Sequence, residues 1–118
     1  MANKKTTTKL KADGRIWINT NNGKLIGKGR IELIEKIKQF GSIRQAAAAM
    51  EMSYRQAWQT IDDINTKAKT PIVISHRGGK GGGSATVTEK GEALIALFNS
   101  FNMKFQAFLS KEAGKFIF

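Results

Sequence analysis

What the 118-residue chain lacks already excludes most kinds of active site. It has no cysteine, so disulfides, thiolate metal sites and cysteine nucleophiles are excluded. Its one histidine, His76, cannot form a zinc site without cysteine or several carboxylate partners. The candidate acids Glu51, Asp62 and Asp63 have no histidine near them in the sequence. We therefore expect no enzyme, no catalytic residues, and no bound metal or cofactor.

Long apolar runs are also missing. No stretch approaches the roughly 18 consecutive apolar residues of a membrane span. The polar segment 1–11 carries four lysines and has no apolar stretch that a signal peptidase could use. We therefore expect a soluble protein of the cytoplasm that does not associate with a membrane.

Acidic residues are scarce, and the chain is strongly basic. Twenty Lys and Arg residues against nine Asp and Glu residues give a net charge of +11. The excess is largest in residues 1–30, which carry eight basic residues and one acidic residue. Such a field favours polyanions, with nucleic acid first and an acidic membrane surface second. Charge alone does not choose between DNA, RNA and lipid, and solubility with a flexible basic tail is a further interpretation.

The chain as a whole has the length and composition of one ordinary domain, with 41% hydrophobic and 25% charged residues. Residues 1–9 contain too few apolar groups to offset the entropy of ordering, and predict a disordered basic arm. Residues 10–112 form the predicted domain, and residues 113–118 a tail.

The predicted fold class is α+β, mainly α. Alternation around Ile16 and Ile18, followed by turn residues, predicts an N-terminal strand or hairpin. Ser42 and Ser53 are predicted helix N-caps, and Thr88 caps a long final helix. The other predicted elements, in order, are helices at 31–40, 43–50 and 54–67 and strands at 72–77 and 85–88.

The segment 42–64 predicts a helix-turn-helix, because only three residues separate two helices and the first is short and alanine-rich. We expect the second helix to bury Ala57, Trp58, Ile61 and Ile64. Its other side can pair with base edges, arginine with guanine and glutamine with adenine. That side carries Ser53, Tyr54, Arg55, Gln56, Gln59 and Thr60. An ordinary helical hairpin with a polar outer face is the alternative.

A hairpin with a basic, glycine-rich tip follows this motif and predicts a wing at 77–84. Arg77 and Lys80 lie at and near the tip, where glycines let the backbone follow a groove wall closely. The spacing lacks the lysine of a phosphate-binding P-loop. A flexible linker and a backbone anion nest are alternative interpretations of the glycine run.

Large apolar side chains recur in the last helix at steps of four and three residues, a heptad seam. Five of them are too many for three short helices to cover, and a symmetric dimer would bury them while placing two recognition helices on two half-sites. The predicted dimer interface is Leu94, Phe98, Phe101, Phe105 and Phe108. An intramolecular core is the alternative.

Several short motifs together resemble one known family. They are GRIELI at 29–34, GSIRQAA at 41–47, MSYRQAW at 52–58, the wing GGKGGG at 78–83 and VTEKG at 87–91. In these motifs the chain resembles the N-terminal DNA-binding domain of ModE-type molybdate-responsive transcription regulators. The alanine-rich helix alone would be a weak signal, because LysR-type regulators share it. The resemblance covers residues 10–112.

The resemblance implies a winged helix that dimerises, binds a palindromic operator and regulates bacterial transcription. Carried onto this chain, it implies that Ser53, Tyr54, Arg55, Gln56 and Gln59 face the major groove. It implies that Ser42, Arg44, Arg77 and Lys80 hold the DNA backbone or minor groove. The molybdate-binding domains of this family are C-terminal and we expect none within these residues, so the chain is either a stand-alone member or a separated fragment.

The sequence therefore predicts a homodimeric, sequence-specific regulator of transcription that binds double-stranded DNA in the cytoplasm, at the nucleoid. Its recognition helix spans about 53–67. Two alternatives remain open: a protein-interaction module that uses the phenylalanine helix to bind an unknown partner, and a non-specific nucleoid-type DNA binder.

Overall fold

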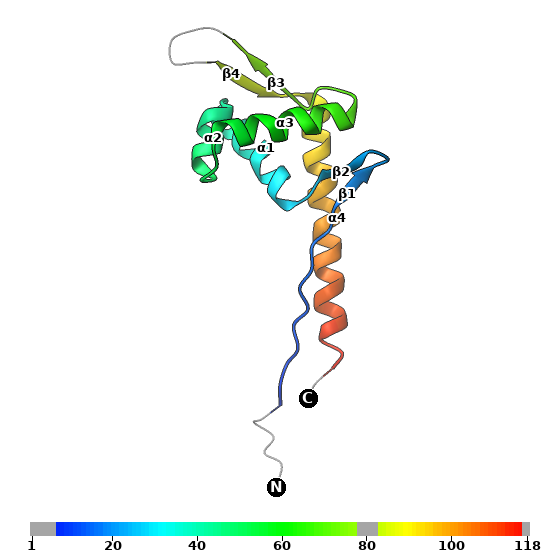
Figure 1. Ribbon diagram of the computed structural model, residues 1–118. Coiled ribbons are helices and arrows are strands. Elements are labelled where there is room, and N and C mark those ends of the chain that lie inside the picture. The colour runs from blue at the N-terminus through cyan, green and yellow to red at the C-terminus, as the bar shows by residue number, and fades with distance from the viewer. Residues whose placement is uncertain (1–6, 78–82, 117–118) are drawn as a thin grey trace.

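A computed structural model describes residues 7–77 and 83–116, and a three-helix head with a long projecting helix dominates it (Figure 1). The helices are α1 (Lys28–Phe40), α2 (Ile43–Ala49), α3 (Tyr54–Ala68) and α4 (Glu89–Ala113). Two antiparallel hairpins complete the described elements: β1 (Ile18–Thr20) with β2 (Gly23–Ile26), and β3 (Val73–His76) with β4 (Ser84–Val87). The predicted α+β winged helix-turn-helix, with its N-terminal hairpin and long last helix, is confirmed.

Local signals mark three helix starts and one helix end, although α1 begins at Lys28, three residues before the predicted start. Ser42, Ser53 and Thr88 are all N-caps, each with its Oγ accepting a backbone N–H bond at 3.0–3.1 Å. Gly41 ends α1 in the left-handed region, with φ 65°, a conformation that costs glycine little. Four of the eight boundaries of the described helices therefore have a local chemical cause, whereas α1 begins after Gly27 without a side-chain cap.

The core surrounds α1, where α2, α3, the start of α4 and the two hairpins come together. α1 is the central element and buries Ile31, Leu33, Ile34 and Ile37. Alanines at 46, 47 and 57 are fully buried and let α2 and α3 approach closely. The rest of the core is Leu25, Ile26, Ile43, Ile61, Ile64, Ile72, Val73, Ala85 and Phe98.

The prediction that Trp58 belongs to the buried face of α3 is wrong, because 46% of this residue is exposed. Ala57, Ile61 and Ile64 form the buried stripe. Trp58 lies about 100° around the helix from Ala57, since an α-helix has 3.6 residues per turn. It therefore projects at the edge of the core, on the side that faces the wing.

The wing hairpin is attached to α3 and to the turn between α1 and α2. The Asn65 side chain of α3 donates to Val73 O (2.9 Å) and accepts from the backbone N–H groups of Ile72 (2.8 Å) and Val73 (3.2 Å). On the other strand, Ala85 N donates to Gly41 O (2.9 Å). The base of the wing therefore has a defined position relative to α3.

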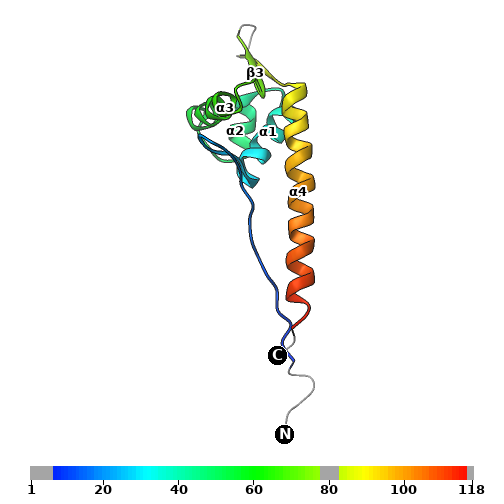
Figure 2. The ribbon, with the colours of Figure 1, turned by 90° about the vertical axis from the view of Figure 1, so that its right-hand side faces the viewer.

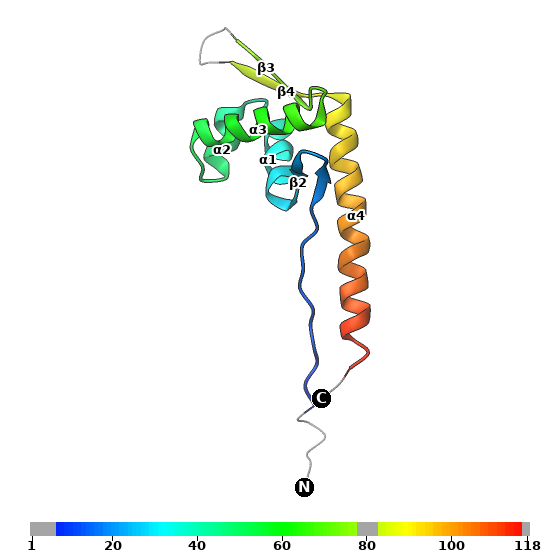
Figure 3. The same cartoon turned by 45° about the vertical axis from the view of Figure 1, so that its right-hand side comes forward.

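The long axis of the molecule is α4, which is about 38 Å long at 1.5 Å per residue. The chain measures 73 × 30 × 20 Å, and its radius of gyration of 19.2 Å exceeds the roughly 13.5 Å of a compact domain of this length. Figures 2 and 3 show α4 running away from the head. Among the described residues, no helix combines the length and apolar character needed to cross a membrane.

The segment before β1 runs antiparallel to the projecting part of α4 (Figures 1 and 3). It contacts the helix at Gly14, whose carbonyl accepts a bond from Gln106 Nε2 at 3.1 Å. A Cβ on Gly14 would lie 3.0 Å from the Phe105 ring and 3.4 Å from Leu109, so the backbone packs directly on these side chains. The predicted arm (1–9) and tail (113–118) lie partly outside the described residues and stay predictions.

Candidate nucleic-acid interface

The N-terminal half of α3 presents the predicted base-reading residues to solvent. Tyr54, Arg55, Gln56 and Gln59 are all exposed. Arg55 and Gln59 are four residues apart and therefore share one face of the helix. Ser53 is exposed as well, but its Oγ accepts the Gln56 N–H as the N-cap, which leaves the hydroxyl proton for an external acceptor.

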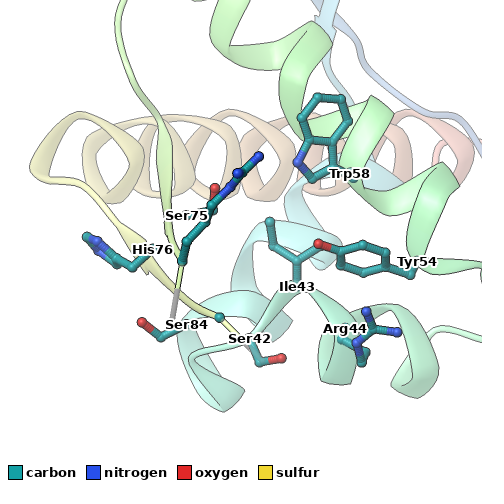
Figure 4. A pocket seen from close by; sticks show the side chains of 10 residues that line it. Ser42, Ile43, Arg44, Tyr54, Trp58, Ser75, His76 and Ser84 are labelled. Atoms are coloured by element: carbon teal, nitrogen blue, oxygen red, sulfur yellow. The ribbon is translucent and has the colours of Figure 1, made fainter. Parts of the chain in front are cut away.

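A polar groove of about 470 Å³ separates this helix from the wing, and we call it the wing groove (Figure 4). It contains two arginines and no acidic residue, so its walls favour an anion. The start of α2, the wing-facing side of α3 and both wing strands contribute to it. The lining residues are Ser42, Ile43, Arg44, Tyr54, Trp58, Ser75, His76, Arg77, Gly83 and Ser84.

Three of the four predicted backbone-contacting residues meet in the wing groove. Ser42 and Arg44 come from the start of α2, and Arg77 follows β3. The fourth, Lys80, lies outside the described residues. The fold therefore brings Arg44 and Arg77 to one groove, although they are 33 positions apart, and their contact with DNA stays a prediction.

Arg44 is held in place by an aromatic ring. Its guanidinium carbon lies 4.3 Å from the centroid of the Tyr54 ring, a cation–π contact between α2 and α3. At an exposed site such a contact contributes about 0.5–1 kcal/mol. The pairing orients the Arg44 charge at the mouth of the groove, beside the N-terminus of α3.

Sequence reasoning missed four lining residues of the wing groove, Ile43, Trp58, Ser75 and His76, and included Gly83 and Ser84 only as part of the predicted wing. Ser75 and His76 are adjacent in β3 and both line the groove, which the period-2 alternation of a strand does not predict. The sequence of the wing does not indicate which of its residues face α3. His76 Nε2 lies 3.4 Å from Thr86 Oγ1 across the hairpin. The helical period of 3.6 residues, counted from Ala57, places Ile61 and Ile64 on the same face and Trp58 beside it, so a strict count would have separated Trp58 from the core.

Neither of the two acidic residues of α3 lines the wing groove itself. Asp63 Oδ2 pairs with Arg30 of α1 (2.8 Å) and with Lys67 (3.0 Å). The hydrogen bond from Arg30, followed by that from Lys67, holds the pKa of Asp63 below its usual value. The negative charge is thereby neutralised within the head. Asp62 is exposed and borders the wing groove, because it lines a small neighbouring pocket with Trp58, Asn65 and Ser75.

The predicted phenylalanine seam divides between two faces of α4. Phe98 is 2% exposed and belongs to the core of its own chain, which corrects its assignment to a seam on the surface. Leu94 packs against that core, and Phe105 lies beneath Gly14. Phe101 and Phe108 remain 56% and 57% exposed.

The face of α4 that is left open includes a residue that the sequence analysis omitted. Leu97 is exposed one turn before Phe101, and with Phe108 these residues form what we call the α4 stripe. Two heptad patterns overlap in this helix. The pattern through Leu97 also contains Lys104, so the all-apolar pattern through Phe98 is the stronger signal in the sequence. The head packs on the side of α4 that carries Phe98, so the pattern through Leu97 faces solvent.

Within residues 7–77 and 83–116, no cluster of three histidine or acidic side chains could hold a metal ion. The groups that remain available in the wing groove are hydroxyls, guanidinium groups, an imidazole and aromatic rings. These groups can bind an anion and pack on an apolar ring.

Comparison with known proteins places the chain beside one group of regulators. No protein-family model matches it. It is 33% identical to the molybdenum transport protein ModE of Azotobacter vinelandii over 97 residues, 82% of this chain and 36% of that protein. It is 44% identical to the transcriptional regulator ModE of Yersinia pestis over 70 residues, 59% of this chain and 27% of that protein.

The DNA-binding transcriptional dual regulator ModE of Escherichia coli K12 is 40% identical over 70 residues, which are 59% of this chain and 27% of that protein. The chain thus spans about a quarter to a third of the length of these curated relatives. A crystal structure of a LysR family transcriptional regulator matches 74% of the chain and 28% of its own with a TM-score of 0.54 at 16% identity. The predicted resemblance to ModE-type regulators and the winged-helix fold are both confirmed.

Proposed function

We propose that this chain, a relative of the ModE regulators, is a sequence-specific DNA-binding module that regulates transcription. The observation that carries the proposal is the placement of the exposed N-terminal half of α3 beside the acid-free wing groove. The net charge of +11 supplies the field that attracts a polyanion. The proposed activity is binding, without a catalytic step or a cofactor, in the cytoplasm of a bacterium.

In the proposed complex α3 enters the major groove with its N-terminal end. Arg55 and Gln59 project from one face and can bond guanine and adenine edges. Arg44 and Arg77 both line the wing groove and neutralise phosphates on the wing-facing side of the reading helix. The wing extends toward the neighbouring minor groove. Phosphate contacts then set the position of the module, and the α3 side chains read the sequence.

The proposal includes a homodimer formed through the α4 stripe. Leu97, Phe101 and Phe108 are exposed along a helix that projects away from the head, so a second copy can cover them without disturbing the core. A two-fold axis along this interface would give two copies of α3 facing two half-sites. The expected operator is therefore an inverted repeat with its halves about one helical turn apart.

The direct test is a selection from random duplex DNA at about 150 mM salt. Enrichment of an inverted repeat is the expected result. Retention of DNA without any enriched motif would instead favour a non-specific nucleoid-type binder. Failure to retain DNA would overturn the proposal, and the α4 stripe would then favour a protein-interaction module.

A salt titration separates these outcomes independently. If six or more phosphates are contacted, affinity should fall by orders of magnitude between about 50 and 200 mM salt. Binding of a protein partner through apolar side chains of α4 should hardly respond to salt over the same range.

A further inference from the structure

The chain has two tryptophans of nearly equal exposure in very different surroundings. Trp17 is 45% exposed and Trp58 46%. Trp17 lies just before β1, where it packs closely on Gly27 and Lys24 Nζ stands 4.3 Å from its ring. Its ring therefore already has partners in its own chain, Gly27 and Lys24, and it does not line the wing groove.

Trp58 instead lines two adjoining pockets, the wing groove and the small pocket that contains Asp62. It lines the wing groove together with Tyr54 and Ser75, and the nitrogen-bearing edge of its indole is turned toward the wing strand (Figure 4). Tryptophan is among the most costly side chains to leave in water, since its ring carries up to about 250 Å² of largely apolar surface. A half-exposed indole in a polar, cationic groove therefore indicates a ligand with an apolar face and a nearby anion.

The deoxyribose–phosphate unit of a DNA strand has this combination. If α3 occupies the major groove and the wing the next minor groove, the strand that divides these two grooves must pass between them. The space between α3 and the wing is the wing groove. The indole N–H is a donor only, which suits a phosphate oxygen, and the arginines flanking the groove carry the neutralising charge.

We propose that Trp58 is a DNA-contacting residue that packs its indole on the sugar of this strand and donates Nε1–H to the adjacent phosphate. This inference rests on the proposed function. It assigns Trp58 to holding the backbone and not to reading bases. Tyr54, which pairs with Arg44, forms the neighbouring part of the same wall.

Two single-tryptophan proteins test the contact directly. W17F retains only Trp58, and W58F retains only Trp17, which serves as the matched control. Each is titrated with the selected duplex, and acrylamide quenching of its fluorescence is compared before and after saturation. Binding itself is followed separately by the anisotropy of a labelled duplex. We expect quenching of Trp58 to fall at least twofold on DNA binding, and quenching of Trp17 to stay unchanged.

The outcomes separate this inference from the function on which it rests. If the unmodified chain does not bind DNA, both the proposed function and the Trp58 contact are overturned. Binding by anisotropy with unchanged quenching of Trp58 would overturn only the Trp58 contact. Equal protection of both tryptophans would also overturn it, because a general effect of binding would then explain the signal.

Affinity measurements test the assignment to the backbone. W58A should weaken binding about tenfold, equally on operator and unrelated duplex, because sugar and phosphate are common to both. W58F keeps an aromatic face and loses the N–H, so it should lie between W58A and the unmodified chain. A loss confined to the operator would contradict the backbone assignment. Thermal unfolding of each variant verifies folding, and W58F remains informative if W58A does not fold.

Discussion

At the scale of single residues, Asp63 shows how one side chain connects three elements. It lies in α3 and pairs with Arg30 of α1, and Arg30 also donates to the Leu25 carbonyl of β2 (3.2 Å). Lys67 joins the same carboxylate and donates to the Lys24 carbonyl (3.3 Å). The Asp63 side chain is 37% exposed, so solvent screens these pairs and their contribution is modest.

We expect Asp63→Asn to lower the free energy of unfolding at pH 7 by about 1 kcal/mol. The pKa of Asp63 is lowered in the folded state, chiefly by the Arg30 hydrogen bond. The stabilisation is therefore present above the unfolded pKa of about 3.9 and is lost as the pH falls through the lower folded value. Urea unfolding at several pH values measures this. Exposed Asp62→Asn is the control, and a difference between Asp63→Asn and the unmodified chain that persists at the lowest pH would contradict the argument.

At the scale of elements, the position of the wing relative to α3 depends on one amide. Asn65 makes three hydrogen bonds to the backbone at the start of β3, one as donor and two as acceptor. Asn65→Asp keeps the shape but replaces the donor with an oxygen facing the Val73 carbonyl. We expect a loss of stability of about 1–3 kcal/mol and faster amide hydrogen exchange at Ile72 and Val73.

The matched control for this change is Asn99→Asp, an exposed position on α4. It carries the same change of charge, so any general effect of one additional negative charge on folding or DNA affinity appears there as well. Unfolding in denaturant and hydrogen exchange measure the two variants side by side. Equal behaviour of the two would mean that Asn65 does not hold the wing.

Elements also show how far the sequence alone predicts this molecule. N-cap serines and Gly41 act on neighbouring backbone groups, so helix boundaries follow from local chemistry. The exposure of Trp58 depends instead on where the wing lies, and no local pattern specifies that. Whether Phe98 or Leu97 faces solvent on α4 depends on how the head packs against this helix. The Asn65 contacts depend on how the turn after α3 brings Ile72 and Val73 back to that helix. Each of these is a tertiary effect.

At the scale of the whole molecule, the projecting helix α4 determines the expected assembly. The Gly14 segment covers one side of this helix, and the α4 stripe remains open on another. Phe101 and Phe108 are one heptad apart on that stripe, as in a helix that pairs with a copy of itself. Met103 is 72% exposed but lies about 160° around the helix from Phe101. A glutamate on the α4 stripe should therefore disrupt the dimer, whereas a glutamate at Met103 should not.

We expect light scattering to give twice the chain mass of 13.0 kDa for the unmodified chain. Phe101→Glu combined with Phe108→Glu should give a monomer, because two like charges would face their copies across the two-fold axis in an apolar interface. Met103→Glu should leave the dimer intact. The double variant should still bind an isolated half-site but lose its preference for the inverted repeat, since each α3 and wing groove remains complete within one chain. If the double variant is still a dimer, the interface lies elsewhere. If the unmodified chain is a monomer with and without DNA, the homodimer is wrong and the α4 stripe would be a binding surface for a different protein.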